Sequence, residues 1–322
     1  MINPNQREIA SCSDDQTISI WDIDKGQHLK TLIGHTGRVR ALDYSSNGQK
    51  LASCSEDKTI RLWDIQSCDC LKVLAGHKKR IRSVSFSPDD QVLISGSEDR
   101  TIRLWNVETG ECICVLPEHN NSVWATKFSP NSNTFASCSE DGTVRIWEIE
   151  KLQPSRIKCL KVLEGHQNRV RSIDFSPDGQ IIASGSEDYT IKLWDIQSGR
   201  CLKTFKGHSS PIWEVAFHPT RKILSSCSSD HQIRVWDSVT GTCLMVLSGH
   251  KKSVRSVIFS SDGKMIVSGS KDGEIRIWDT ETGECQKILK KIRPYEGMTF
   301  SGIQGLPNVA KAALRNLGAI GD

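Results

Sequence analysis

Serine, histidine and aspartate recur together along this chain at fixed spacing, and these residue types could form a hydrolytic triad. The first set is His35, Ser53 and Asp57, followed by Trp63. Five equivalent sets follow: His77, Ser95, Asp99 and Trp105; His119, Ser137, Asp141 and Trp147; His166, Ser184, Asp188 and Trp194; His208, Ser226, Asp230 and Trp236; and His250, Ser268, Asp272 and Trp278. Histidine precedes tryptophan by 28 residues in all six sets. An enzyme builds its nucleophile once, in one cleft, so the repetition predicts a structural network. In that network, aspartate accepts from histidine and turn amides, and tryptophan donates its indole N–H.

The elements that position these residues follow the same period. Seven tryptophans, at positions 21, 63, 105, 147, 194, 236 and 278, are separated by 42, 42, 42, 47, 42 and 42 residues. Around Trp105, four short β-branched or alternating runs cover residues 81–86, 92–97, 101–105 and 111–116, with Pro, Gly and Asp in the turns between them. This pattern predicts a four-stranded antiparallel sheet in each repeat. Such units cannot bury both faces alone, so they pack radially until a ring closes.

These residues and spacings resemble the WD40 family of β-propellers over nearly the whole chain. The resemblance implies an all-β fold, a single seven-bladed propeller of four-stranded antiparallel blades over residues 1–306, with a short C-terminal helical tail over 307–322. It also implies that each His, Ser, Asp and Trp set is a structural tetrad. The departures from the family pattern are Glu118 before His119, Asn106 and Glu148 after their tryptophans, and five extra residues within 150–157.

The chain begins out of phase with its own repeat. Blade one has Ser11, Asp15 and Trp21, but it lacks the histidine and almost all of the innermost strand, because Ile2 aligns with Phe86 at the end of that strand. An open ring would leave backbone groups unpaired. Continuing the period predicts that residues 297–303 enter as the innermost strand of blade one. Residues 307–317 form an amphipathic pattern, which predicts a short helix that packs on the ring or docks another domain.

The tail carries a second resemblance. Arg293 to Met298, Gly302, Gly305-Leu306, Leu314, Leu317 and Gly318-Ala319 resemble the C-terminal end of bacterial WD40 proteins, many of which carry a NACHT or NB-ARC (STAND) NTPase upstream. That resemblance implies a sensor or restraint in a bacterial signalling assembly. The chain contains no G-x-x-x-x-G-K-[ST] loop, so it is interpreted either as a stand-alone relative or as the last propeller of a longer or broken gene.

Composition favours a cytoplasmic protein, which we expect to be a monomer. The 42 basic and 38 acidic residues give a net charge of +4, too mild a balance to predict nucleic-acid binding. No apolar run approaches the ~18 residues of a membrane span and no leader begins the chain, so no membrane partner is expected. Ten of the twelve cysteines fall in two repeat columns, Cys12, Cys54, Cys138 and Cys227, and Cys70, Cys112, Cys159, Cys201, Cys243 and Cys285. We expect free thiols packed as small apolar side chains, with no metal and no cofactor.

Two repeat positions are predicted to face a partner around the top of the ring. The positions flanking the first strand's leading Val or Ile include Arg38, Arg40, Arg80, Arg82, Trp124, Arg169, Arg171, Trp213 and Arg255. The position before the tetrad aspartate holds Asp14, Glu56, Glu98, Glu140, Glu187, Ser229 and Lys271. Aromatic and arginine side chains together are typical of interaction hot spots, and the basic bias suggests an acidic peptide or a phosphate-bearing ligand. The alternative is that Arg and Glu simply pair across neighbouring blades as solvated salt bridges.

The sequence therefore predicts a non-catalytic platform that binds a peptide or protein on its top face. The rival interpretation is a propeller enzyme with a site in the central channel, for which His28, His218 and His231 are the spare histidines. Nucleic-acid binding is a third interpretation, and an orphaned C-terminal fragment of a STAND-type NTPase is a fourth.

Overall fold

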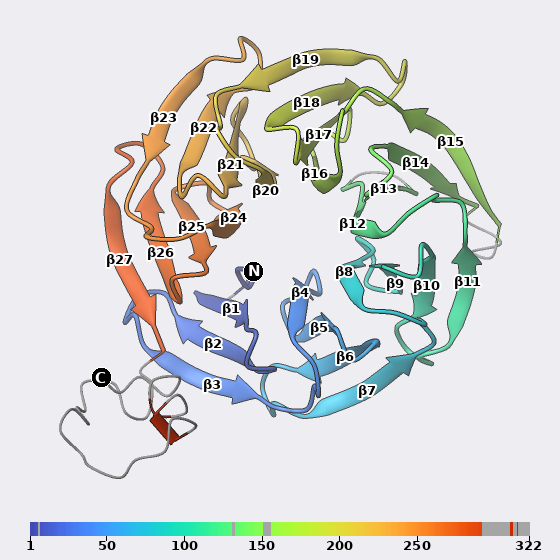
Figure 1. The fold of residues 1–322 in the computed structure, drawn as a ribbon. Helices are drawn as coiled ribbons and strands as arrows, with labels where there is room; N and C mark the ends of the chain where they lie inside the picture. Colours follow the sequence, from blue (N-terminus) through green and yellow to red (C-terminus); the bar gives the residue numbers. More distant parts are fainter. Residues whose placement is uncertain (6, 131–132, 151–155, 292–309, 312–313, 315–322) are drawn as a thin grey trace. The chain divides into compact units, whose positions relative to one another are not determined.

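A computed structural model describes residues 1–5, 7–130, 133–150, 156–291, 310, 311 and 314. Residues Met1–Ile288 form one compact unit. Seven antiparallel sheets stand radially around a common axis in this unit (Figure 1), which confirms the predicted seven-bladed propeller. Among the described residues no helix is long and apolar enough to cross a membrane.

The strands follow the predicted period. Blade one contains β1 (Glu8–Cys12), β2 (Ile18–Asp22) and β3 (His28–Leu32); blade two β4 (Val39–Tyr44), β5 (Lys50–Ser55), β6 (Thr59–Asp64) and β7 (Cys70–Ala75); blade three β8 (Ile81–Phe86), β9 (Val92–Ser97), β10 (Ile102–Asn106) and β11 (Cys112–Leu116); blade four β12 (Val123–Phe128), β13 (Thr134–Ser139), β14 (Val144–Ile149) and β15 (Ile157–Leu163); blade five β16 (Val170–Phe175), β17 (Ile181–Ser186), β18 (Thr190–Asp195) and β19 (Cys201–Lys206); blade six β20 (Ile212–Phe217), β21 (Ile223–Ser228), β22 (Ile233–Asp237) and β23 (Cys243–Leu247); and blade seven β24 (Val254–Phe259), β25 (Met265–Ser270), β26 (Glu274–Asp279) and β27 (Cys285–Lys290). In blades two to seven the first strand is innermost and the fourth is outermost.

The core lies between neighbouring sheets rather than at a single centre. One buried cluster joins Ala52, Cys54 and Leu62 of blade two to Ile81 and Phe86 of blade three. In blades two to six the second strand is almost completely buried, whereas the outermost strand is more exposed. This explains why the second run is apolar on both faces: it is covered by a sheet on each side.

Tight turns place the tetrad aspartate between the second and third strands. At one position of this turn the backbone has positive φ, and it is occupied by Lys58 (φ 72°), Arg100 (71°) and Tyr189 (67°) as well as by Gly142 (82°) and Gly273 (84°). Positive φ favours glycine, because a Cβ crowds the neighbouring carbonyl oxygen. The repeat therefore tolerates strain here rather than requiring glycine.

Blade one is a three-stranded sheet among the described residues. Ile2 bridges Ile9, the Met1 carbonyl accepts from Ala10 N at 2.8 Å, and Asn3 N donates to Glu8 O at 2.9 Å. Ile2 therefore occupies the position predicted from its alignment with Phe86, at the end of an innermost strand. The predicted strand 297–303 lies outside the described residues, as does most of the predicted tail helix, of which Ala310, Lys311 and Leu314 are described and are helical.

The cysteine columns behave differently from each other. Cys54, Cys138 and Cys227 are fully buried, as expected for small apolar side chains, but Cys12 at the same repeat position is exposed. The outer column begins the outermost strand of five blades, where Cys70, Cys112, Cys201, Cys243 and Cys285 are exposed, and in blade four Cys159 lies within β15 and is partly buried. The expectation of packed thiols is therefore wrong for the five exposed cysteines of the outer column, because the outermost strand pairs with the third strand on one edge and has no strand on its other edge.

Candidate functional site

The repeated Ser, His and Asp have the hydrogen bonds of a triad but not its accessibility. In the first set His35 Nδ1 lies 2.7 Å from Asp57 Oδ2, and His35 Nε2 lies 2.8 Å from Ser53 Oγ. The same two contacts occur in the other five sets. Ser53 Oγ also accepts from Trp63 Nε1 at 2.8 Å, and its side chain is fully buried. A nucleophile must reach its substrate, so this geometry supports the structural interpretation of the tetrads.

In two tetrads, those of His77 and His250, the pKa shifts agree with a neutral histidine bonded to a charged aspartate. Burial by itself would raise the pKa of Asp57, but hydrogen bonds from His35 and Thr59 outweigh it and hold that pKa well below its ordinary value. Asp99, Asp141 and Asp188 behave in the same way. Burial lowers the pKa of His77 and His250. Each network is therefore satisfied internally.

The three spare histidines do not converge. His28 is on β3 and contacts the edge of Trp21. His218 follows β20, is buried, and uses both ring nitrogens: Nε2 lies 3.1 Å from Gly263 O, and Nδ1 accepts from Thr220 N and Arg221 N. His231 occupies a turn of positive φ after β21. The rival channel enzyme therefore has no histidine cluster among the described residues.

Within the same described ranges, one group of side chains has the proximity needed to hold a metal ion: His250, Asp272 and Glu274 of blade seven. Its ligand atoms are already engaged. His250 lies between Asp272 Oδ2 at 2.9 Å and Ser268 Oγ at 2.8 Å, and Glu274 Oε2 accepts two hydrogen bonds from Arg276. The donor set is a tetrad plus a largely buried ion pair, so it does not fit a metal centre.

The predicted partner-binding arginines and glutamates lie at one rim of the ring, where the innermost strands begin and the second strands end. Arg40 Nε donates to Glu56 Oε1 at 2.9 Å, and this arginine also contacts Asp14 Oδ1 at 3.1 Å. Equivalent pairs within a blade join Arg82 to Glu98 at 2.9 Å and Arg171 to Glu187 at 2.8 Å. The paired side chains are 7–26% exposed.

Arg38, Arg80 and Arg169, which we call the outer row, are more exposed than the inner row of Arg40, Arg82 and Arg171, and they pair across blades. Arg169 Nη2 lies 2.6 Å from Glu140 of the preceding blade, and Arg80 Nε lies 3.8 Å from Glu56. Arg38 lies 3.7 Å from Asp14 and is about half exposed. The alternative of cross-blade salt bridges thus describes the outer row, whereas the inner row pairs mainly within its own blade.

Trp124 and Trp213 are brought together with three of the inner arginines. The guanidinium carbon of Arg82 lies 4.6 Å from the Trp124 ring centroid, and that of Arg171 lies 3.7 Å from it. Trp213 carries Arg171 at 4.8 Å and Arg255 at 3.4 Å. Each indole therefore receives one cation from the preceding blade and one from the following blade. We name Arg82, Trp124, Arg171, Trp213 and Arg255 the arginine–tryptophan ladder; it crosses five consecutive blades.

The ladder changes the predicted character of the rim. Its members are half-buried, and the faces of both indoles are occupied by guanidinium groups at cation–π distance, so neither tryptophan is a free aromatic patch. Trp213 Nε1 donates to Ser229 Oγ at 2.6 Å, whereas Trp124 Nε1 is buried without a protein partner. A partner would meet a pre-ordered row of ring edges and guanidinium edges.

Charged side chains close to the axis were missed by sequence reasoning. Asp43, Asp174 and Glu214 each accept a hydrogen bond at 2.8 Å from a backbone N–H of the next blade, namely Phe86, Phe217 and Val257. Burial raises the pKa of all three carboxyls, and Lys127 opposes the shift. The available signal was a charge on an inner strand whose other repeats carry serine or an apolar residue. These contacts connect innermost strands that share no sheet.

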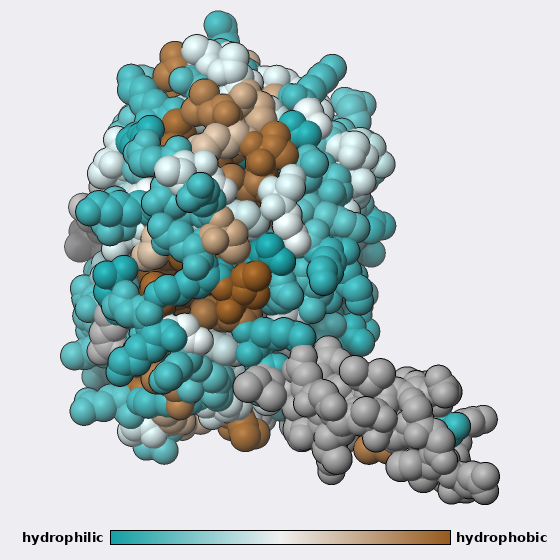
Figure 2. All heavy atoms as spheres, turned by 90° about the vertical axis from the view of Figure 1, so that its left-hand side faces the viewer, coloured by the Kyte–Doolittle hydropathy of each residue, from teal (hydrophilic) through white to brown (hydrophobic). Residues whose placement is uncertain are grey.

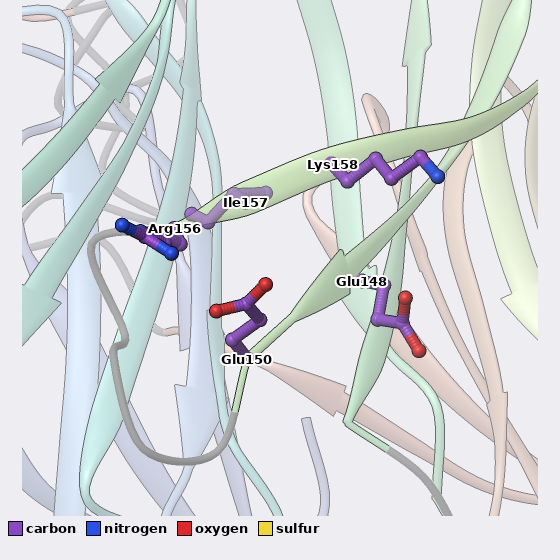
Figure 3. Close-up of a pocket in the computed structure, with 5 residues that line it drawn as sticks. All are labelled: Glu148, Glu150, Arg156, Ile157 and Lys158. Atoms are coloured by element: carbon purple, nitrogen blue, oxygen red, sulfur yellow. The ribbon is translucent and has the colours of Figure 1, made fainter.

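Other surfaces are less organised. A polar groove between blades four and five includes Glu140, Asp141, His166 and Arg169. Figure 3 shows a pocket at the β14–β15 connection, lined by Glu148, Glu150, Arg156, Ile157 and Lys158, where acidic and basic side chains lie on the two outer strands of blade four. The outer strands expose large apolar residues, among them Leu202, Leu244, Val246 and Ile288. Figure 2 shows apolar patches separated by polar surface on the side that carries β23 and β27.

Comparison with known proteins follows the same repeats. Residues 86–299, more than half of the chain, match the family model described as TEP-1 second beta-propeller. Residues 2–22 and 26–64 match the WD domain, G-beta repeat.

Curated relatives match single repeats. The chain is 54% identical over 44 residues to nuclear distribution protein nudF 2 of Aspergillus clavatus, which is 14% of this chain and 10% of that protein. It is 54% identical over 41 residues to nuclear distribution protein PAC1 of Mycosarcoma maydis (13% and 9%), and 51% identical over 39 residues to PAC1 of Saccharomyces cerevisiae (12% and 8%). The matched region is about a tenth of the length of these relatives.

Proposed function

Because this chain belongs to the β-propeller family described by the TEP-1 second beta-propeller and carries WD40 repeats, a fold typical of protein-interaction scaffolds, we propose that it binds a protein partner through the rim that carries the arginine–tryptophan ladder. The observation that carries the proposal is the ladder itself. Five side chains from five blades stack in one row, and tryptophan and arginine are the residue types enriched at interaction hot spots.

Pre-organisation supports this assignment. Arg82 and Arg171 are each held by a glutamate of their own blade and by the indoles beside them. A partner that docks there has little side-chain entropy to remove, and ordering each mobile side chain would otherwise cost about 0.5–1.5 kcal/mol. The exposed outer arginines Arg38, Arg80 and Arg169 would form a polar margin around this centre.

We further propose that the protein acts in the cytoplasm as a sensor or restraint in a bacterial signalling assembly. The support is the resemblance of residues 293–319 to the tail of bacterial WD40 proteins associated with STAND NTPases. If the chain functions as part of a longer protein, the same rim would contact that protein's other domains instead of a separate partner. Neither a membrane nor a nucleic acid is needed in this scheme.

The experiment is quantitative affinity capture from native extract with three folded proteins. The wild type is compared with Trp213→Ala/Arg171→Ala in the ladder and with Leu202→Ala/Leu244→Ala on the outer strands as a matched control. We expect a specific partner that is retained by the outer-strand variant and reduced at least tenfold by the ladder variant. A partner lost only by the outer-strand variant would refute the rim assignment and place binding on the blade edges. Circular dichroism and the unfolding midpoint establish that all three are folded.

A further inference from the structure

Blade seven breaks the charge pattern of the rim. In blades two, three and five the second residue of the innermost strand is arginine, and the residue before the tetrad aspartate is the glutamate that binds it. Blade seven keeps the arginine, Arg255, but has Lys271 at the glutamate position. The strand register is unchanged, because Val254 pairs with Ser270 just as Val170 pairs with Ser186 in blade five. Two cations therefore occupy the positions of an ion pair.

Nothing in the described part of the chain neutralises these two cations. Neither side chain forms an ion pair with a carboxylate among the described residues, and Arg255 Nε is buried without a hydrogen-bond partner. The nearby carboxylates are committed elsewhere. Asp14 contacts Arg40 at 3.1 Å and Arg38 at 3.7 Å, and Asp272 binds His250 at 2.9 Å.

The neighbouring side chains named by the contacts of this site are uncharged. The Arg255 guanidinium lies over the Trp213 ring, 3.4 Å from its centroid, and the Trp213 indole N–H donates to Ser229 Oγ, which lies 3.1 Å from Ser253 Oγ. Burial lowers the pKa of Arg255, and the charges of Arg171 and Arg40 contribute in the same direction, whereas Cys227 and the Asp14 carboxylate, which forms no ion pair with Arg255, act in the opposite direction. A half-buried guanidinium that lacks its carboxylate carries an uncompensated desolvation cost.

We infer that Arg255 and Lys271 form a binding site for a carboxylate side chain of an acidic partner segment, which takes the place that Glu56, Glu98 and Glu187 fill in their own blades. The inference rests on the proposed function, since it names the chemistry that the rim recognises. Arg255 would donate from its guanidinium edge, as Arg171 does to Glu187, and Lys271, which is exposed, would add a second contact. Of the four blades that carry arginine at this position, blade seven alone leaves it without an ion pair to a described residue, which would make the site specific to that blade.

The decisive variant is Lys271→Glu, because it separates binding from stability. It restores the arrangement of blades two, three and five, so the variant should be at least as stable as the wild type. The new glutamate side chain would also bind Arg255, so a carboxylate of another molecule should no longer bind there. Lys206→Glu, the same charge change on exposed β19, is the matched control. Arg255→Gln removes the guanidinium as a second test.

The probe is a fluorescein-labelled hexaglutamate peptide with blocked termini, followed by fluorescence anisotropy, with hexaglutamine as the uncharged comparison and inorganic phosphate as a competitor. We expect Lys271→Glu and Arg255→Gln each to weaken hexaglutamate binding about tenfold or more, the loss of one charge-assisted contact, and Lys206→Glu to change it less than about twofold. Equal losses in Lys271→Glu and Lys206→Glu would overturn the inference, because net charge alone would explain them. So would binding of hexaglutamine as tight as that of hexaglutamate, or phosphate competition strong enough to show a phosphate site.

The two proposals fail separately. If the partner captured by the wild type is lost in Trp213→Ala/Arg171→Ala but Lys271→Glu binds both it and hexaglutamate normally, the carboxylate site is refuted and the rim function stands. If hexaglutamate binding is lost in Lys271→Glu while the ladder variant still captures the partner, the rim function is refuted and the carboxylate site stands.

Discussion

Replacing the tetrad serine of blade five by alanine should destabilise the protein more than the same change in blade one. Ser184 Oγ accepts from Trp194 Nε1 at 2.8 Å and contacts His166 Nε2 at 2.7 Å, and its side chain is fully buried. Ser184→Ala leaves two buried polar groups without partners, at about 1–3 kcal/mol each, so we expect a loss of about 2–6 kcal/mol. Ser11 bonds Trp21 Nε1 at 2.8 Å, and the first blade has no tetrad histidine, so Ser11→Ala should cost about 1 kcal/mol.

The assay is equilibrium unfolding in urea followed by circular dichroism, with the slope of the transition required to be the same in both variants. Ser11→Ala is the matched control, since it changes the same atom at the same repeat position. If the two variants lose the same free energy of unfolding within about 0.5 kcal/mol, the histidine contact contributes nothing and the argument that the tetrad is a mutually satisfied network is wrong.

Three further predictions concern the tetrad, the ladder and a turn. Burial lowers the pKa of His77 in the folded protein, so this histidine binds a proton in the unfolded chain first as pH falls below about 6.5. Proton binding to the unfolded chain lowers the free energy of unfolding. The difference in this free energy between the wild type and His77→Gln, measured by urea unfolding, should therefore become smaller from pH 7 to pH 5. The Arg255 guanidinium carbon lies 3.4 Å from the Trp213 ring centroid, so a double-mutant cycle on the free energy of unfolding should give a coupling of about 0.5–1 kcal/mol for this pair. The same cycle between Trp213 and Arg40, which make no cation–π contact, should give no coupling. Tyr189 has φ 67° and is 46% exposed, so Tyr189→Gly should raise the unfolding midpoint or leave it unchanged, because relief of about 1–2 kcal/mol of backbone strain offsets the added freedom of the unfolded chain; a clear fall would contradict this.

The fold was predictable because the same residue types recur at the same spacing in each repeat. The spacing from His35 to Trp63 recurs in five further blades, so an accidental match at one position could not mislead the prediction. The histidine–aspartate hydrogen bond within a tetrad was predictable for the same reason, since buried polar groups must satisfy one another, whereas the serine hydroxyl that accepts from the indole N–H was identified by the structure. The strand completing blade one was predicted from phase alone and stays a prediction.

The site was predictable as a set of positions but not as a set of contacts. Sequence placed Trp124, Arg171 and Trp213 on one rim, since the repeat fixes where each side chain starts. It did not show that Arg171 lies over both indoles, because that depends on rotamers and on the distance between adjacent blades. The axial residues Asp43 and Lys127 were missed because their partners lie about a whole repeat or more away in sequence.

Specific binding by such a ring depends on residues that differ from their equivalents in the other repeats. Residues that recur in every blade, such as Ser184 and its equivalents, satisfy one another and leave nothing for a partner to bind. Trp124 and Trp213 replace arginine and thereby bring cations from both neighbouring blades onto their rings. Lys271 replaces glutamate and leaves Arg255 without a carboxylate. These departures make the blades unequal. The ladder ends in blade seven at Arg255, and in our proposal the carboxylate that binds this arginine comes from another molecule.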